Sequence, residues 1–287
     1  MTDTTEALYA NSPGADSSNG FSLDGRRTPS RKLIASVWRS RQLITILARK
    51  DFYVRYRRAT FGLLWAAALP LLQALVLAFV VSRFATFDTG GHYVVFVLAG
   101  TVAWSTFGAI VSAGSTAIVD GAVLSTKIYF PRVVLPLVTV WTSAYGLVIS
   151  TVLLLAATLV SGVGLGFRTL LIVPALALTL LLGASFALVL SALHVYFRDV
   201  RYLVQAALLV WLYFTPVIYP LGAIGRVRPW IEANPATGVV ELYRAATVGA
   251  DSGMSTPLLW TGGWSIALLV VGLLLHCRYD RVFVDLL

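Results

Sequence analysis

The sequence predicts an all-α protein that crosses a membrane several times. Hydrophobic residues make up 58% of its 287 residues, charged residues make up 12%, and the mean hydropathy is +0.81. Soluble domains carry about a quarter charged residues, so this composition excludes an ordinary soluble domain. A chain of this length holds six apolar spans of about 20 residues with short connections. We expect six transmembrane helices, an N-terminal amphipathic interface helix, and re-entrant gate helices between the fifth and sixth spans.

Changes in composition divide the chain into three parts. Residues 1–30 are polar and predict a disordered cytoplasmic tail. Residues 31–58 interleave apolar and basic side chains, which predicts an amphipathic helix or helix pair in the headgroup plane. A soluble helix packed on a cytoplasmic partner would give the same pattern. Residues 59–287 form the predicted transmembrane domain, with spans at about 61–82, 94–117, 133–160, 170–193, 202–219 and 258–276.

Basic residues predict how the chain is oriented. The run Arg49–Arg58 directly precedes the first span, and the chain then carries no charge until Arg83. Most of the 22 Lys and Arg residues fall in segments that are cytoplasmic if both termini are cytoplasmic. Because basic residues are enriched on the cytoplasmic side, we expect a multi-pass plasma-membrane protein with both termini inside. The predicted membrane-interface residues are Trp38, Arg55, Arg57 and Arg58.

The longest connection, Pro220–Pro257, lies outside in this topology and is partly apolar. Asn234-Pro235 separates two of its apolar segments and predicts a break between two short helices. We expect these helices to dip back towards the membrane, because irregular backbone at that depth must be sheltered by protein or by a water-filled cavity.

Groups for catalysis, metal binding or ATP hydrolysis are not evident. The three lysines lie outside any glycine-rich turn, so no phosphate-binding loop is present and the chain should not hydrolyse ATP itself. The histidines His92, His194 and His276 are far apart in sequence, so we expect no metal site. Glu232 and Glu241 could pair as acid and base, but a surface or gating role suits their outer position better. The net charge of +9 is assigned to the membrane surface rather than to nucleic acid.

The cores of the expected spans contain essentially no charged residues. Ion-coupled carriers usually keep ionisable groups at mid-membrane, because those groups perform the coupling. If the protein moves a substrate, its energy should therefore come from another source.

Four local patterns occur along the chain: Arg55–Arg58 followed by Phe61–Trp65 and Pro70, Lys127–Arg132 with Pro136, Phe197–Val200, and Phe214–Tyr219 followed by Asn234-Pro235 and Tyr243-Arg244. In their order and spacing they resemble the membrane permease of type-2 ABC exporters in the polysaccharide, O-antigen and teichoic-acid branch. The resemblance covers about residue 33 to the C-terminus. It implies a pore between two copies of this chain, above two copies of a separate ATP-binding subunit that holds the ATP and Mg²⁺.

The resemblance also implies which residues meet the ATP-binding subunit. Residues 116–129 would form a coupling helix, with contacts at Asp120, Val123, Leu124 and Lys127. Arg198 and Asp199 would form a second contact on the same side. Their alternative role is to mark the membrane boundary and cap the fifth helix.

The outer connection would form the gate at the pore mouth. Its predicted gate residues are Pro229, Asn234, Pro235, Tyr243 and Arg244. Aromatic side chains suit a sugar pathway because they stack on sugar rings, but Trp and Tyr near span ends also form interfacial belts. The candidate channel aromatics are Trp65, Trp104, Trp141, Trp211, Tyr213, Phe214 and Tyr219.

The expected function is export of a lipid-linked polysaccharide for cell-envelope assembly. The arginine-rich, lysine-poor composition suggests an actinobacterial cell-wall glycan such as galactan. A permease for drugs or small lipids would share the fold and is the first alternative. A membrane-embedded glycosyltransferase is the enzyme alternative, although only 13 acidic residues are available for its chemistry. A structural membrane anchor is a further alternative.

Overall fold

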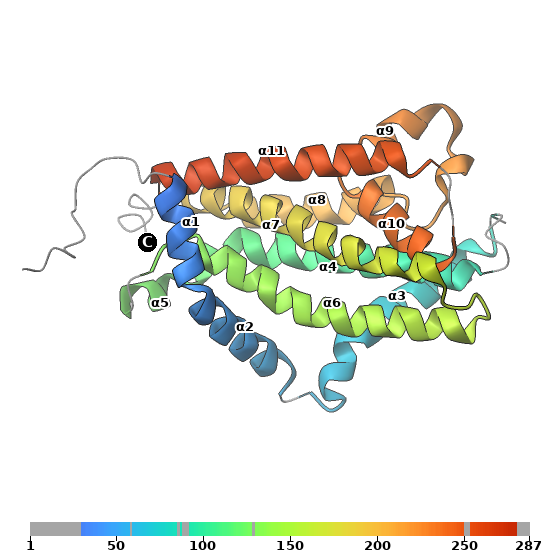
Figure 1. Ribbon diagram of the computed structural model, residues 1–287, viewed down its shortest axis with the longest axis horizontal. Helices are drawn as coiled ribbons and strands as arrows, with labels where there is room; N and C mark the ends of the chain where they lie inside the picture. The colour runs from blue at the N-terminus through green and yellow to red at the C-terminus, as the bar shows by residue number, and fades with distance from the viewer. Residues whose placement is uncertain are drawn as a thin grey trace, which may run out of the picture.

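The computed structural model describes residues 30–57, 59–84, 87, 92–127, 130–249 and 253–279, and the regular structure in these ranges is entirely helical. Figure 1 shows an elongated bundle with α10 (Thr237–Thr247) near one end and α5 (Ala122–Lys127) near the other. We call these the α10 end and the α5 end. The C-terminal end of α11 (Ser255–Tyr279) lies at the α5 end, beside α1 (Ser30–Arg39).

Five helical segments are long and apolar enough to cross a membrane. They coincide with the segments expected as the first, second, third, fourth and sixth spans, and their crossing of the membrane stays a prediction. Two of them begin with a 3₁₀ turn, η1 (Gly62–Leu64) before α3 and η2 (Phe167–Leu171) before α7. The α-helical parts are α3 (Trp65–Val81), α4 (Tyr93–Asp120), α6 (Val134–Val160), α7 (Ile172–Tyr196) and α11.

The fifth expected span is shorter than predicted. Helix α8 (Val200–Phe214) has 15 residues, about 22 Å at 1.5 Å per residue, whereas the hydrocarbon core is about 30 Å thick. The helix ends at Phe214, before the predicted end of the span at residue 219. Thr215 adopts extended backbone (φ −97°, ψ 134°) because Pro216 follows it, and a residue before proline is disfavoured in the helical region. The fifth crossing therefore stays a prediction.

The N-terminal segment expected as one interface helix or a pair is two helices, α1 and α2 (Arg41–Tyr56), joined at Ser40. Helix α1 packs on α11, where Leu33 lies in a cluster with Leu273. Helix α2 packs on α6: Ala48 is fully buried, and its carbonyl accepts a 3.4 Å hydrogen bond from Thr142 Oγ1. Both helices are thus attached to the bundle along one side, as Figure 1 shows.

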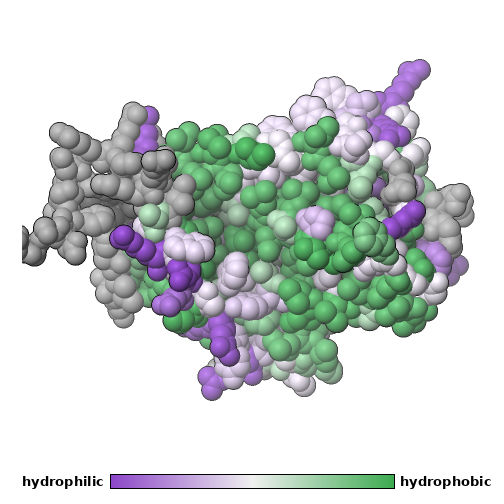
Figure 2. All heavy atoms as spheres, in the orientation of Figure 1, coloured by the Kyte–Doolittle hydropathy of each residue, from purple (hydrophilic) through white to green (hydrophobic). Residues whose placement is uncertain are grey.

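Helix α4 forms the centre of the bundle. It contacts α3, α6, α7, α8 and α10, and most of its side chains are buried. The outward faces of the other long helices are apolar and exposed, as at Val76 and Val152, which are 61% and 62% exposed. Figure 2 shows hydrophobic side chains over the middle of the bundle and hydrophilic ones mainly towards its ends. This distribution is expected when lipid, rather than water, surrounds the middle.

Candidate functional site

The connection between α8 and α11 folds into the α10 end of the bundle. It contains two 3₁₀ turns, η3 (Leu221–Ala223) and η4 (Gly225–Val227), then α9 (Arg228–Glu232) and α10. The structure confirms two helices on either side of Asn234-Pro235. Every residue of α10 is buried, and the helix contacts α4, α7 and α11. Its depth relative to the membrane stays a prediction.

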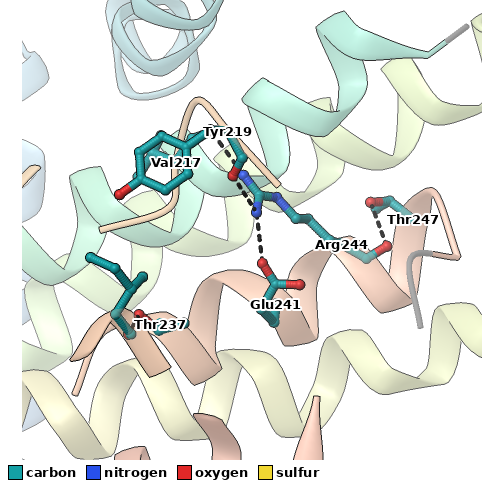
Figure 3. A network of polar contacts seen from close by, with 7 residues as sticks. Val217, Tyr219, Thr237, Glu241, Arg244 and Thr247 are labelled. Atoms are coloured by element: carbon teal, nitrogen blue, oxygen red, sulfur yellow. Dashed lines mark hydrogen bonds and ion pairs between the residues drawn. The ribbon is translucent and has the colours of Figure 1, made fainter. Parts of the chain in front are cut away.

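Helix α10 carries a buried ion pair, shown in Figure 3. Arg244 Nη1 lies 2.7 Å from Glu241 Oε1, and the two side chains are 0% and 2% exposed. The Arg244 guanidinium also lies over the ring of Phe96 in α4, 3.6 Å from the ring centroid. A buried charge is tolerated only when it is paired and hydrogen-bonded, and this one has both kinds of partner.

The same guanidinium binds the irregular backbone that follows α8. Arg244 Nη2 donates a 2.9 Å hydrogen bond to the carbonyl of Val217, and Nη1 donates a longer one of 3.5 Å to the carbonyl of Tyr219. The carbonyl between them, of Ile218, accepts a 2.8 Å bond from the Tyr93 hydroxyl at the start of α4. Three successive carbonyls without a helical partner are thus satisfied by side chains from α10 and α4.

The electrostatics of Arg244 reflect two opposing influences. Burial lowers the pKa of its guanidinium, and the adjacent Glu241 carboxylate raises it. Arginine starts from a value so high that it remains charged in proteins. The α10 end therefore holds a buried charge pair in which the Arg244 guanidinium is fixed by Glu241, the Val217 carbonyl and the Phe96 ring.

Asn234 joins the end of α8 to the turn between α9 and α10. Its Oδ1 accepts hydrogen bonds from Trp211 Nε1 (2.9 Å) and from the backbone N–H of Ala236 (3.0 Å). Its Nδ2 donates to the carbonyl of Phe214 (3.0 Å) and to Thr215 Oγ1 (3.1 Å). Asn234, Trp211 and Phe214, which were singled out separately in the sequence, therefore form one contact.

Helix α10 approaches α11 closely at Gly238. Its backbone N–H donates a 3.1 Å hydrogen bond to Thr261 Oγ1 of α11. A Cβ at this position would lie 2.5 Å from that oxygen and 2.6 Å from the carbonyl oxygen of Pro257. Glycine is required here because two backbones meet with no room for a side chain.

The other predicted gate residues differ in exposure. Pro229 is exposed near the start of α9, where its fixed φ suits a helix N-terminus. Pro235 is half-buried after Asn234, and Tyr243 is fully buried.

The candidate channel aromatics do not share one surface. Trp104, which is buried, and Trp211, which is half-buried, pack with Phe107 and Phe186 at ring-centroid distances of 5.4–6.0 Å. This arrangement fills space between α4, α7 and α8 by edge-to-face contacts. The remaining candidates are half-buried or exposed in this chain: Trp65, Trp141, Tyr213, Phe214 and Tyr219.

Helix α5 lies within residues 116–129, where the coupling helix was expected. Val123 is 70% exposed, and Asp120, at the last position of α4, is also exposed. Leu124 is half-buried and packs against the cluster between α2 and α6. Lys127 ends α5, and its side chain lies outside the described residues.

Arg198 and Asp199 lie in the exposed turn between α7 and α8, at the same end as α5. Asp199 precedes α8, yet its side chain makes no capping hydrogen bond, so the expected cap is not formed.

The predicted interface residues lie along α1 and α2. Trp38 is 68% exposed, and Arg55 and Arg57 are also exposed. Arg57 holds its guanidinium 5.8 Å from the ring of Tyr53. Arg58 lies outside the described residues.

No group of three or more metal-ligating side chains occurs in the described part of the chain. His194 and His276 are buried within their own helices, α7 and α11.

Sequence reasoning missed Glu241 as the partner of Arg244 and placed it in a surface or gating role. Two opposite charges three residues apart, within the otherwise apolar segment 239–246, were the available signal. An isolated charge pair at helical spacing in an apolar segment is expected to pair internally. The contributions of Phe96, Tyr93 and the Val217 carbonyl left no such signal, because these groups come from distant elements.

The arrangement defines a class of protein: a polytopic helical membrane protein with a buried helix at one end of the bundle and an exposed short helix at the other. Residues 42–248 match the family described as ABC-2 type transporter, so the chain belongs to that family. The match extends from α2 through α10 and includes the buried ion pair.

Relatives with assigned roles are also similar over most of their length. The chain is 28% identical over 244 residues to the O-antigen export system permease protein RfbA of Myxococcus xanthus, covering 83% of this chain and 92% of that protein. It is 25% identical over 248 residues to the RfbA protein of Klebsiella pneumoniae, covering 85% and 95%.

Proposed function

We propose that this chain is the permease subunit of an ATP-driven exporter that moves a lipid-linked polysaccharide across the cytoplasmic membrane. The chain belongs to the ABC-2 type transporter family. The similar RfbA proteins are O-antigen export permeases, which supports a polysaccharide cargo. In this proposal, two copies of the chain form the translocation path and a separate ATP-binding subunit supplies the energy.

The observation that carries this proposal is the difference between the two ends of the bundle. At the α10 end, the buried helix α10 is fixed through Arg244 to the segment after α8 and to α4. The α5 end presents exposed side chains at Asp120 and Val123. A rigid end and an end with exposed side chains suit a transporter in which a partner's movement is transmitted through rigid helices to a gate.

Charge supports placing the α5 end inside. Helices α1 and α2 lie towards the α5 end and carry exposed basic residues, including Arg39, Arg41 and Arg49. The orientation is testable with single cysteines in a Cys277→Ser background. We expect Val123→Cys to react only with a membrane-permeant thiol reagent in intact cells, and Leu165→Cys, between α6 and η2, to react with an impermeant one. The reverse labelling would overturn the orientation.

The function is tested by co-purifying the chain with its ATP-binding subunit and measuring ATP hydrolysis with and without lipid-linked glycan. We expect a stable complex whose hydrolysis rate changes with the glycan. A stable complex that responds to small amphiphiles but not to glycans would replace the cargo with a drug or small lipid. Absence of a complex would overturn the exporter proposal.

A further inference from the structure

A groove of about 750 Å³ runs between the N-terminal helices and α6 near the α5 end. This volume is within the range of small-molecule sites, about 300–1,000 Å³. Helix α6 contributes apolar and aromatic side chains, α1 contributes Trp38, and α2 contributes Ile44 and Ile46 beside three polar side chains. The side chains used in the argument are Trp38, Arg41, Gln42, Thr45, Val140 and Trp141.

Arg41 gives the groove a positive charge at its edge. Its guanidinium lies 5.0 Å from the ring centroid of Trp38. Within the described ranges, no carboxylate lies within ion-pair distance of Arg41. An exposed guanidinium held against an indole ring presents its remaining N–H groups to an anionic group such as a phosphate, which it binds in a bidentate manner.

Most of the groove is apolar, and its polar side chains all come from α2. Gln42 and Thr45 lie beside Arg41 on α2, whereas Val140 belongs to the opposite wall on α6. Trp38 and Trp141 are 68% and 48% exposed, so both indole rings reach the surface of the groove. Indole rings favour the headgroup level of a bilayer. Figure 2 shows hydrophilic side chains over α1 and α2 beside hydrophobic ones over α6.

A second groove in the same chain provides an internal comparison. It has a volume of about 310 Å³, lies between α7 and α8, and is lined only by apolar and aromatic side chains, among them Leu193, Leu203 and Trp211. It offers no charged group to a headgroup. Ordinary acyl chains of any lipid would fill it, so the basic edge distinguishes the first groove.

We propose that the groove between α2 and α6 binds one anionic phospholipid, with its phosphate at Arg41 and an acyl chain along Val140 and Trp141. The lipid would connect the interface helices to the transmembrane bundle at the leaflet boundary. The proposal uses the orientation proposed above, with the α5 end at the anionic cytoplasmic leaflet. It does not depend on the cargo.

The test is native mass spectrometry of the purified full-length chain, with dioleoyl phosphatidylglycerol or dioleoyl phosphatidylcholine added after delipidation. We expect tighter binding of phosphatidylglycerol to the parent. Arg41→Gln should weaken this binding about fivefold, since one basic residue near a membrane surface contributes about 1 kcal/mol. Binding of phosphatidylcholine should not change.

Two further variants test separately whether binding needs the charge of Arg41 and the open volume of the groove. Arg49→Gln removes an exposed basic residue of α2 that does not line the groove, and it should leave phosphatidylglycerol binding as in the parent. Thr45→Trp fills the groove from its exposed side while keeping Arg41, and it should weaken binding of phosphatidylglycerol. Arg49 and Thr45 are both exposed, so both variants should still fold.

Three outcomes would overturn the proposal. Equal binding of both lipids by the parent would show that the groove makes only ordinary lipid contacts and does not select an anionic headgroup. Equal loss in Arg41→Gln and Arg49→Gln would indicate a diffuse surface charge. Stronger binding of a polyprenyl pyrophosphate, which displaces phosphatidylglycerol, would assign the groove to the cargo. The assay contains no ATP and no glycan, so its failure is distinct from failure of the export proposal.

Discussion

Charged residues differ in burial and pairing between the two ends of the bundle. At the α10 end, Arg244 and Glu241 are buried, paired and bound to neighbouring elements. At the α5 end, Asp120, Arg198 and Asp199 are exposed. Removing one member of a buried pair is costly, whereas an exposed charge contributes little to stability. One end therefore has a fixed internal geometry, and the other has a surface free to meet a partner.

The largest expected effect comes from breaking the buried pair. Arg244→Met leaves the Glu241 carboxylate buried without its partner and releases the Val217 carbonyl. We expect the free energy of unfolding to fall by about 3–5 kcal/mol. Denaturant titration of the purified protein, followed by tryptophan fluorescence, measures this loss.

The double variant Arg244→Met/Glu241→Leu is the control for this prediction. It removes both charges and should regain most of the lost stability, because a buried ion pair contributes little beyond an apolar pair of similar volume. Equal destabilisation in the single and double variants would show that pairing is not what Arg244 provides.

The next largest effect is expected at the contact between α10 and α11. Gly238→Val places side-chain carbons against Thr261 and the Pro257 carbonyl, which are backbone and buried groups unable to move aside. We expect a loss of about 1–3 kcal/mol from overpacking. Gly262→Val, on α11 where an added Cβ would meet no atom within 4 Å, is the matched control and should lose less.

A smaller effect is expected from removing the contact between α8 and the turn that joins α9 to α10. Asn234→Ala loses the hydrogen bonds to Trp211, Phe214 and Ala236, and half-buried groups lose their partners. We expect the free energy of unfolding to fall by about 1–2 kcal/mol. The emission spectrum of the protein should also shift, because Trp211 Nε1 loses its acceptor. An unchanged spectrum together with unchanged stability would contradict the role assigned to Asn234.

The smallest effect on stability, and the sharpest contrast between the ends, is expected at Val123. Val123→Asp changes an exposed side chain and should alter the free energy of unfolding by less than about 0.5 kcal/mol. It should weaken binding of the ATP-binding subunit about 5- to 30-fold, as loss of a contact of about 1–2 kcal/mol does. Val227→Asp, an exposed change at the α10 end, should leave that binding unaffected in a pull-down titration.

Most of the fold could be predicted because a transmembrane helix depends on the summed hydropathy of about 20 consecutive residues. This quantity is local, and the five long spans follow it closely. Helix α8 is shorter than its apolar run because Pro216 ends the helix while the hydrophobicity continues to Ile218. The break at Ser40 was left open because the pattern of residues 31–58 fits one helix or two.

The candidate site could be predicted only in part. Asn234-Pro235 marked the turn between α9 and α10, and the gate role predicted for Tyr243-Arg244 stays a prediction. The contacts of Arg244 bring together groups from α4, α10 and the segment after α8, and sequence spacing does not encode such distant approaches. The aromatic residues show the same limit: a tryptophan in a span has the same local signature whether it faces lipid, a pathway or, as Trp104 does, the protein interior.

The packing of α1 on α11 has a consequence for biosynthesis. Leu33 lies near the start of the described chain, and its neighbour Leu273 lies near the end. At about 5–20 residues per second, α1 emerges from the ribosome about 10–50 s before its partner helix. Until then the apolar face of α1 lacks α11, so a nascent chain that stalls before α11 exposes this face. Membrane chaperones and proteases could use that exposure to distinguish unfinished chains from complete ones.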